Sequence, residues 1–85
     1  MIVKVSGQPT VTINGSNYSV DVPVAFYDDA GWVGEGTTLT ITGVLTDTPA
    51  NFLSKLTTAS NTWQANVAIR NTFEVKLAGI VGRVL

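Results

Sequence analysis

The chain has 85 residues, of which 13% are charged and 45% are hydrophobic, and its formal net charge is −1. This length allows one small domain, and the absence of cysteine and histidine excludes disulfides, thiolate metal sites and histidine-based catalysis. Because the five basic residues are scattered along a nearly neutral chain, we expect no basic surface for nucleic acid.

The first residues and the length of the apolar runs indicate where in the cell the protein is expected. Residues 1–5 lead directly into alternating, strand-like sequence, without the apolar core of a signal peptide. No apolar run approaches the roughly 20 residues that are needed to span a bilayer. We therefore expect a protein made in a cytoplasm, with no signal peptide, no transmembrane segment and no membrane partner.

Alternating apolar residues predict strands through the first part of the chain. Residues 3–5 and 11–13 alternate apolar and polar side chains, and Asn14-Gly15 is the strongest hairpin signal in the sequence. The return strand is long, with apolar side chains at every second position of residues 18–26. Pro23 lies on the opposite face and has no N–H to donate, so it predicts an edge strand or a bulge.

An acidic, glycine-rich loop follows, AFYDDAGWVGEG at residues 25–36. Asp28, Asp29 and Glu35 offer hard oxygen ligands and are the candidates for a cation site, although their spacing is not that of an EF-hand. The same carboxylates could be paired for glycoside hydrolysis, but so small a domain leaves little room for a pocket. We predict no enzyme activity, no cofactor and no bound metal.

Trp32 stands apart from the other aromatic residues because it lies in this loop. Two interpretations stay open. Its ring either folds back over the end of its own core or anchors a contact patch, since tryptophan is enriched among interface hot spots. Tyr27 would be its companion in such a patch.

In the second half of the chain the spacing of apolar residues changes once, from every second residue to a helical repeat. Threonines alternate with apolar residues over 38–45, where Gly43 indicates a bulge or a close approach. Asp47 or Thr48 then serves as the N-cap of a helix, with Pro49 near its first position. An apolar stripe from Phe52 to Ala59 gives this helix about three turns. Ser60-Asn61 ends it.

Two further strands are expected to close the chain, at 63–70 and 73–77, with a tight turn at Asn71-Thr72. The predicted fold is a mainly β, single domain over residues 1–85. It is a small antiparallel β-barrel or sandwich of about six strands, with one short helix between the fourth and fifth strands.

The polar faces of these strands carry threonine, serine, asparagine, glutamine and alanine, where an ordinary β domain places charges. Such faces can pack on a neighbouring subunit with little desolvation cost. The apolar residues Ile80, Val81, Val84 and Leu85 either form the last core strand or dock on another copy. Together these features favour a repeating assembly.

The stretch TTLTITGVLTDTPANFLSKLTTASNTW, with threonine-rich strands around a short helix, resembles the small structural proteins of tailed bacteriophages. The similarity covers most of the chain, in composition and order of elements. It implies a capsid-decoration, tail or baseplate subunit that packs with copies of itself or with other virion proteins. The alternative from the residues themselves is a small ligand-binding β module, with Trp32 and Tyr27 as a stacking platform for carbohydrate.

Overall fold

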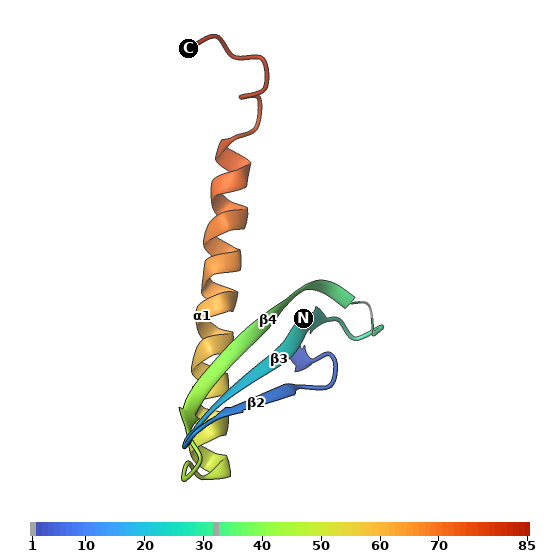
Figure 1. Ribbon diagram of the computed structural model, residues 1–85. Coiled ribbons are helices and arrows are strands. Elements are labelled where there is room, and N and C mark those ends of the chain that lie inside the picture. The colour runs from blue at the N-terminus through green and yellow to red at the C-terminus, as the bar shows by residue number, and fades with distance from the viewer. Residues whose placement is uncertain (1, 32) are drawn as a thin grey trace.

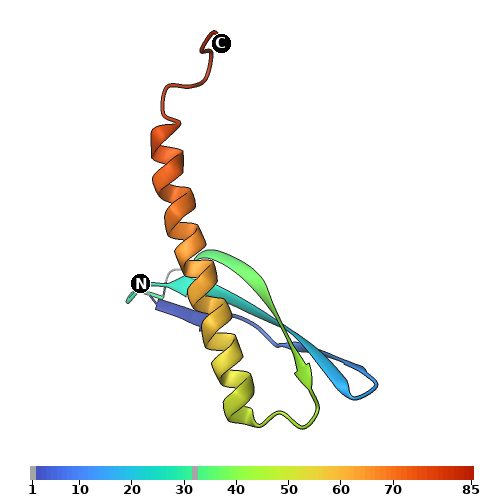
Figure 2. The same cartoon turned by 90° about the vertical axis from the view of Figure 1, so that its left-hand side faces the viewer.

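The structure is a computed structural model, and it describes residues 2–31 and 33–85. Four antiparallel strands come first: β1 (Ile2–Val5), β2 (Thr10–Asn14), β3 (Asn17–Tyr27) and β4 (Val33–Val44). One helix, α1 (Pro49–Lys76), follows them. The helix lies across one face of the sheet, so the fold has two layers (Figures 1 and 2). The predicted mainly β class is confirmed.

The sheet is built around β3. β4 pairs along one side of β3, whereas β1 and β2 share the other side, opposite the two halves of β3. Pro23 lies opposite the break between β1 and β2, where its carbonyl accepts a hydrogen bond of 2.8 Å from the Ser6 N–H. The expected edge strand was therefore wrong, because a break in the neighbouring strands accommodates the missing N–H, and the irregularity in the pairing of β3 lies nearby, between Ala25 and Tyr27.

The predicted hairpin at Asn14-Gly15 is confirmed. Asn14 pairs with Asn17, and Gly15 and Ser16 form the two-residue turn between them. Gly15 has φ of 64°, in the left-handed region that tight hairpin turns reserve for glycine. This turn sets the register that places Val11 opposite Val20 and Ile13 opposite Tyr18.

The core lies between β3, β4 and α1. Its buried members, all on one face of the sheet, are Val20, Val22, Val24, Leu39 and Ile41. From the helix, Phe52, Leu56, Ala59 and Trp63 pack against them. Their spacing of four, three and four residues forms one helical stripe. The other face of the sheet carries exposed threonines, such as Thr38, Thr40 and Thr42, as the alternation predicted.

The helix begins where the sequence predicted. Thr48 is the N-cap, and its side chain accepts a hydrogen bond of 3.1 Å from the Asn51 N–H, with Pro49 in the first turn. However, α1 continues for 28 residues instead of ending at Ser60-Asn61. The predicted strands 63–70 and 73–77 are wrong, since both segments belong to α1. The predicted turn at Asn71-Thr72 is wrong for the same reason.

The predicted closed barrel or sandwich is also wrong. The described strands form one open sheet of four, with a single helix after the last strand. The chain is extended: its radius of gyration is 17.1 Å and its dimensions are 55 × 36 × 18 Å. A compact chain of this length would have a radius of gyration of about 12 Å. The last turns of α1 extend well beyond the sheet (Figure 1).

Candidate assembly surfaces

The outer edge of β4 is the longest open strand edge in the described chain. β4 has 12 residues, and β3 is its partner on one side. Natural β proteins protect such an edge with lysine, proline, bulges or a covering segment. Here the exposed side chains near the edge are mainly threonines, and the one charged residue of the strand, Glu35, is paired with Arg70. Lys55 of α1 covers part of this edge, because its Nζ donates to the Thr42 carbonyl at 3.1 Å, and the edge is open along the rest of the strand.

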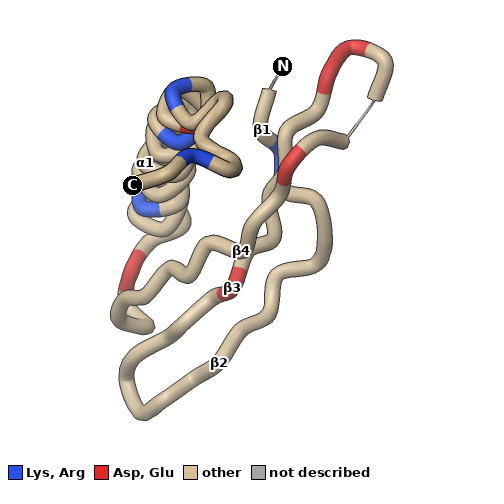
Figure 3. Tube along the Cα trace, turned by 90° about the horizontal axis from the view of Figure 1, so that it is seen from above, with Lys and Arg blue, Asp and Glu red and all other residues tan. Residues whose placement is uncertain are grey.

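An apolar groove separates β2 from the first turn of α1. Its volume is about 490 Å³, and the side chains that line it include Pro9, Val11, Ile13, Leu45, Pro49 and Phe52. Val11 is 60% exposed and Ile13 is 55% exposed. They point to the same face of the sheet as the core, because they pair with Val20 and Tyr18. The helix crosses β3 and β4 and leaves β2 uncovered (Figures 2 and 3).

The second half of α1 and the segment after it form a further exposed surface. Every residue from 71 to 85 is exposed. Ile69 is 67% exposed and Phe73 is 58% exposed, so the helix carries apolar side chains where no sheet lies beneath it. The predicted contact residues beyond the helix are also exposed, and they form no strand of the described sheet: Ile80, Val81, Val84 and Leu85.

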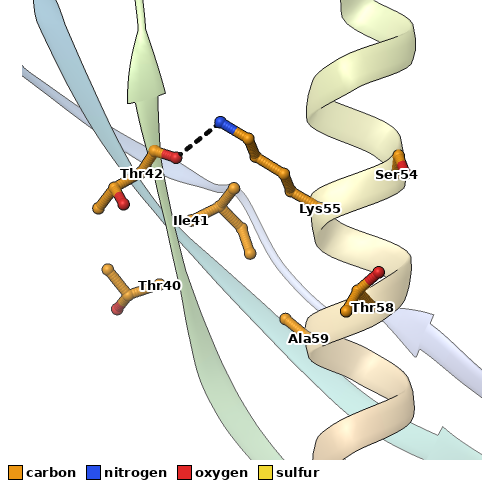
Figure 4. A pocket seen from close by; sticks show the side chains of 7 residues that line it. All are labelled: Thr40, Ile41, Thr42, Ser54, Lys55, Thr58 and Ala59. Carbon is orange, nitrogen blue, oxygen red and sulfur yellow. Dashed lines mark hydrogen bonds between the residues drawn. The ribbon is translucent and has the colours of Figure 1, made fainter.

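Tyr18, Asp47 and Lys55 form a polar cluster that ties the start of α1 to the sheet. The Tyr18 hydroxyl donates to Asp47 Oδ2 at 2.9 Å, and Lys55 Nζ donates to the same oxygen at 2.8 Å. Lys55 Nζ also donates to the Thr42 carbonyl at 3.1 Å, across a shallow pocket of about 360 Å³ between β4 and α1 (Figure 4). Gly43 lies beside the cluster, which confirms the predicted close approach.

The pKa values of all three groups in this cluster are shifted further from pH 7. The hydrogen bond from Lys55, with a second from Tyr18, lowers the pKa of the Asp47 carboxyl. The bond to Asp47 raises the pKa of Lys55. Removal from water, followed by the bond to Asp47, raises the pKa of the Tyr18 hydroxyl. Because general acids and bases work best near the operating pH, this cluster suits a structural tie better than catalysis.

Glu35 and Arg70 form a second tie, between the start of β4 and the last third of α1. The guanidinium donates to both carboxylate oxygens, at 2.6 and 2.5 Å. These bonds lower the pKa of Glu35 and raise the pKa of Arg70. A bidentate pair fixes the helix direction over the sheet at the point where the helix leaves it.

The candidate cation ligands are not brought together by the fold. Glu35 lies on β4 and binds Arg70, whereas Asp28 and Asp29 lie in the turn after β3, closed by a 3.1 Å bond from the Gly31 N–H to the Asp28 carbonyl. Across residues 2–31 and 33–85, no group of three or more histidine, cysteine, aspartate or glutamate side chains is placed to hold a metal ion.

Tyr27 ends β3 and is half-buried, with Lys4 Nζ 5.5 Å from its ring centroid. Trp32, its proposed companion, lies outside the described residues. The aromatic pair that the structure does show is Phe26 and Trp63, whose ring centroids are 4.9 Å apart. Trp63 thus packs against the core, although it comes from α1 and not from the strand expected at 63–70.

Charges are divided between the two layers. Four of the five basic residues lie on α1 or after it, and five of the six acidic residues lie in the strands and loops before it (Figure 3). The two ion pairs that join sheet to helix follow from this division. The sequence signal was present, since all acids but Glu74 precede Pro49.

The groove at β2 was missed from sequence. A signal for it existed in Pro9, Val11, Ile13 and Leu45, four apolar residues in segments too short to bury them.

None of the described helices is long and apolar enough to cross a membrane. The chain matches no protein-family model, no curated protein and no solved structure.

Proposed function

We propose that this protein is a self-assembling structural subunit of a virion-type assembly, in a bacteriophage capsid or tail. It acts by contacts with copies of itself or with other virion proteins, and it needs neither a cofactor nor a catalytic residue. It is made in the host cytoplasm and is then built into the particle. The observation that carries the proposal is the excess of exposed apolar surface on a very small core.

The total surface area, polar and apolar together, shows how far the chain departs from a compact monomer. The chain exposes 6205 Å², whereas a compact monomer of 9.0 kDa would expose about 4,900 Å². A standard protein interface removes about 800 Å² from each partner. The excess of about 1,300 Å² therefore corresponds to more than one such interface, which is what a subunit with several neighbours requires.

The chemistry of the surface supports the same proposal. The open β4 edge and the groove at β2 are poor in charge, and the exposed end of α1 carries charges of both signs at Arg70, Glu74 and Lys76, so two copies meet without strong repulsion. Threonine-rich edges allow backbone hydrogen bonds between chains. A nearly neutral surface of this kind disfavours a protein that works as a dispersed monomer.

Negative-stain imaging of the purified protein tests the proposal. We expect regular particles, such as rings, tubes or shell fragments, or decoration of preformed phage capsids or tails. Dispersed small particles that decorate neither structure would contradict the proposal.

A carbohydrate-binding module is the competing function, and of its two proposed platform residues the structure describes Tyr27 alone. Lys4 already occupies one face of the Tyr27 ring. Glycan binding to a dispersed wild-type protein, abolished by Trp32→Ala, would support this alternative instead.

A further inference from the structure

We infer that the groove between β2 and α1 receives residues 80–85 of a second copy of the same chain. Such contacts join the groove of one subunit to the tail of the next. The inference rests on the proposed function, because it names the contact by which subunits associate. "Tail" below means residues 80–85, and "groove" means the cavity lined by Pro9, Val11, Ile13, Leu45, Pro49 and Phe52.

The two surfaces are matched in chemistry. The tail presents Ile80, Val81, Val84 and Leu85, of which the last three are more than nine-tenths exposed. The groove offers about 490 Å³ lined mainly by apolar side chains, which is room for several aliphatic side chains. Burial of both surfaces removes apolar area from water in each subunit.

Charge and backbone also agree with this pairing. The tail contains one charged side chain, Arg83, and the charged side chain in the groove wall is Asp47. Asp47 is already paired with Lys55, so this side of the groove is nearly neutral and does not repel the tail. β2 pairs with β3 along one side, so its other side offers backbone N–H and C=O groups beside the groove.

A tail cannot enter the groove of its own chain. The groove lies at the first turn of α1, beside Phe52, and the tail follows the opposite end of the helix (Figure 1). The 25 helical steps from Phe52 to Leu77 span about 37 Å along the axis. Even fully extended, residues 78–85 reach back about 29 Å at most. The occupant must therefore come from another copy.

The contact has a directional consequence. Groove and tail are different surfaces at opposite ends of one helix, so the interface is heterologous and not two-fold symmetric. Every subunit that has given its tail still has an open groove. Such contacts continue until they close into a ring or extend as a filament. This is the behaviour expected of a subunit in a ring or tube.

Two variants separate the surfaces. The groove variant carries Val11→Lys and Ile13→Lys, and the tail variant carries Val84→Lys and Leu85→Lys. Thr12→Lys is the control for added charge, because it places a lysine in the same strand on the opposite face. Circular dichroism and urea unfolding of each variant establish that it is folded. The masses of wild type, variants and the equimolar mixture of both double variants are then measured by light scattering.

We expect the wild type and Thr12→Lys to assemble, and each double variant alone to remain at 9.0 kDa. The mixture should give a species of twice that mass and no larger one, because one intact tail meets one intact groove. Double variants that assemble like the wild type would overturn the inference, and so would a mixture of folded variants that stays monomeric. A monomeric wild type would overturn the inference as well, and one that also decorates neither capsids nor tails would overturn the proposed function itself.

Discussion

Gly43 shows how a single residue supports the join between sheet and helix. A Cβ added there would lie 2.6 Å from Lys55 Nζ and 2.6 Å from the Tyr18 hydroxyl, and closer still to the Asp47 carboxylate. Real Cβ atoms do not approach other atoms so closely, so the polar cluster needs glycine at this position. The need is for space, since Gly43 does not have a positive φ.

Gly43→Ala is therefore expected to lower the free energy of unfolding by about 1 kcal/mol, because the three side-chain ends must shift and their hydrogen bonds weaken. Urea unfolding measures the loss. In a Tyr18→Phe/Asp47→Ala background the loss should shrink, because two of the colliding groups are gone. An equal loss in both backgrounds would assign the effect to the strand backbone and not to the cluster.

The two ion pairs predict how stability depends on pH. The pKa values of Glu35 and Asp47 are lowered in the folded chain from 4.5 and 3.8. Their contribution is therefore present above these unfolded values and is lost as the pH falls through the folded ones. The pKa values of Tyr18 and Lys55 are raised from 10.0 and 10.5, so their contribution is complete below these values and is lost as the pH rises through the folded ones.

Unfolding free energy should thus be highest over a plateau near neutral pH and fall on both sides of it. Urea unfolding from about pH 3 to about pH 11 measures the profile. In Asp47→Asn the acid-side fall should become smaller, because one of the two acids is removed. If the unfolding free energy falls equally at low pH in this variant and in the wild type, the cluster does not couple to folding.

At the scale of the elements, the length of α1 is the main difference between the prediction from sequence and the structure. Trp63, Ala65, Val67 and Ile69 alternate as in a strand, but Trp63 and Val67 also continue the helical stripe from Phe52. The two periods share these residues, so alternation alone could not separate them. The stronger signal was the absence of glycine and proline from residue 50 to residue 78, which favours one long helix over a strand, turn and strand.

The strands of the first half were predictable because their signals were local. The Asn14-Gly15 turn and the alternation from Tyr18 to Phe26 depend on neighbours in sequence. The groove depends instead on where α1 crosses the sheet, and no local pattern fixes that crossing. The residues named from sequence as contact candidates at the end of the chain, Ile80, Val81, Val84 and Leu85, are exposed, and their role in contacts stays a prediction.

The N-cap of α1 gives a test at this scale. Thr48→Ala removes the acceptor for the Asn51 N–H and should cost about 1 kcal/mol of unfolding free energy. Thr57→Ala, in an exposed part of the same helix, is the matched control and should be neutral or slightly stabilising. Urea unfolding compares the two. Equal effects would mean that Thr48 acts by propensity and not as a cap.

The end of α1 gives a second test. Residues 71–76 have no sheet beneath them, so their amides should exchange with deuterium quickly in dilute protein and slowly once subunits associate. Residues 52–59 pack on the sheet and serve as the internal reference, with protection at both concentrations. Equal protection of 71–76 at both concentrations would place this end of the helix outside the assembly contacts.

At the scale of the whole molecule, the fold is incomplete as a monomer. Val22 is the one large side chain with no exposed surface among the described residues, while sixteen large apolar side chains are exposed. A two-layer fold with one helix cannot cover its sheet from β2 to β4. Because these surfaces carry few charges, they can contact other copies of the chain without strong repulsion. The exposed tail supplies further apolar side chains beyond the end of α1.

Sedimentation equilibrium across a wide range of protein concentrations tests this account most directly. If the exposed apolar surfaces are interfaces between copies, the average mass should rise with concentration to multiples of 9.0 kDa. Added salt should not reverse the rise, because the contacts are apolar and ionic screening leaves them intact. A mass of 9.0 kDa at every concentration, in a folded protein, would contradict the account.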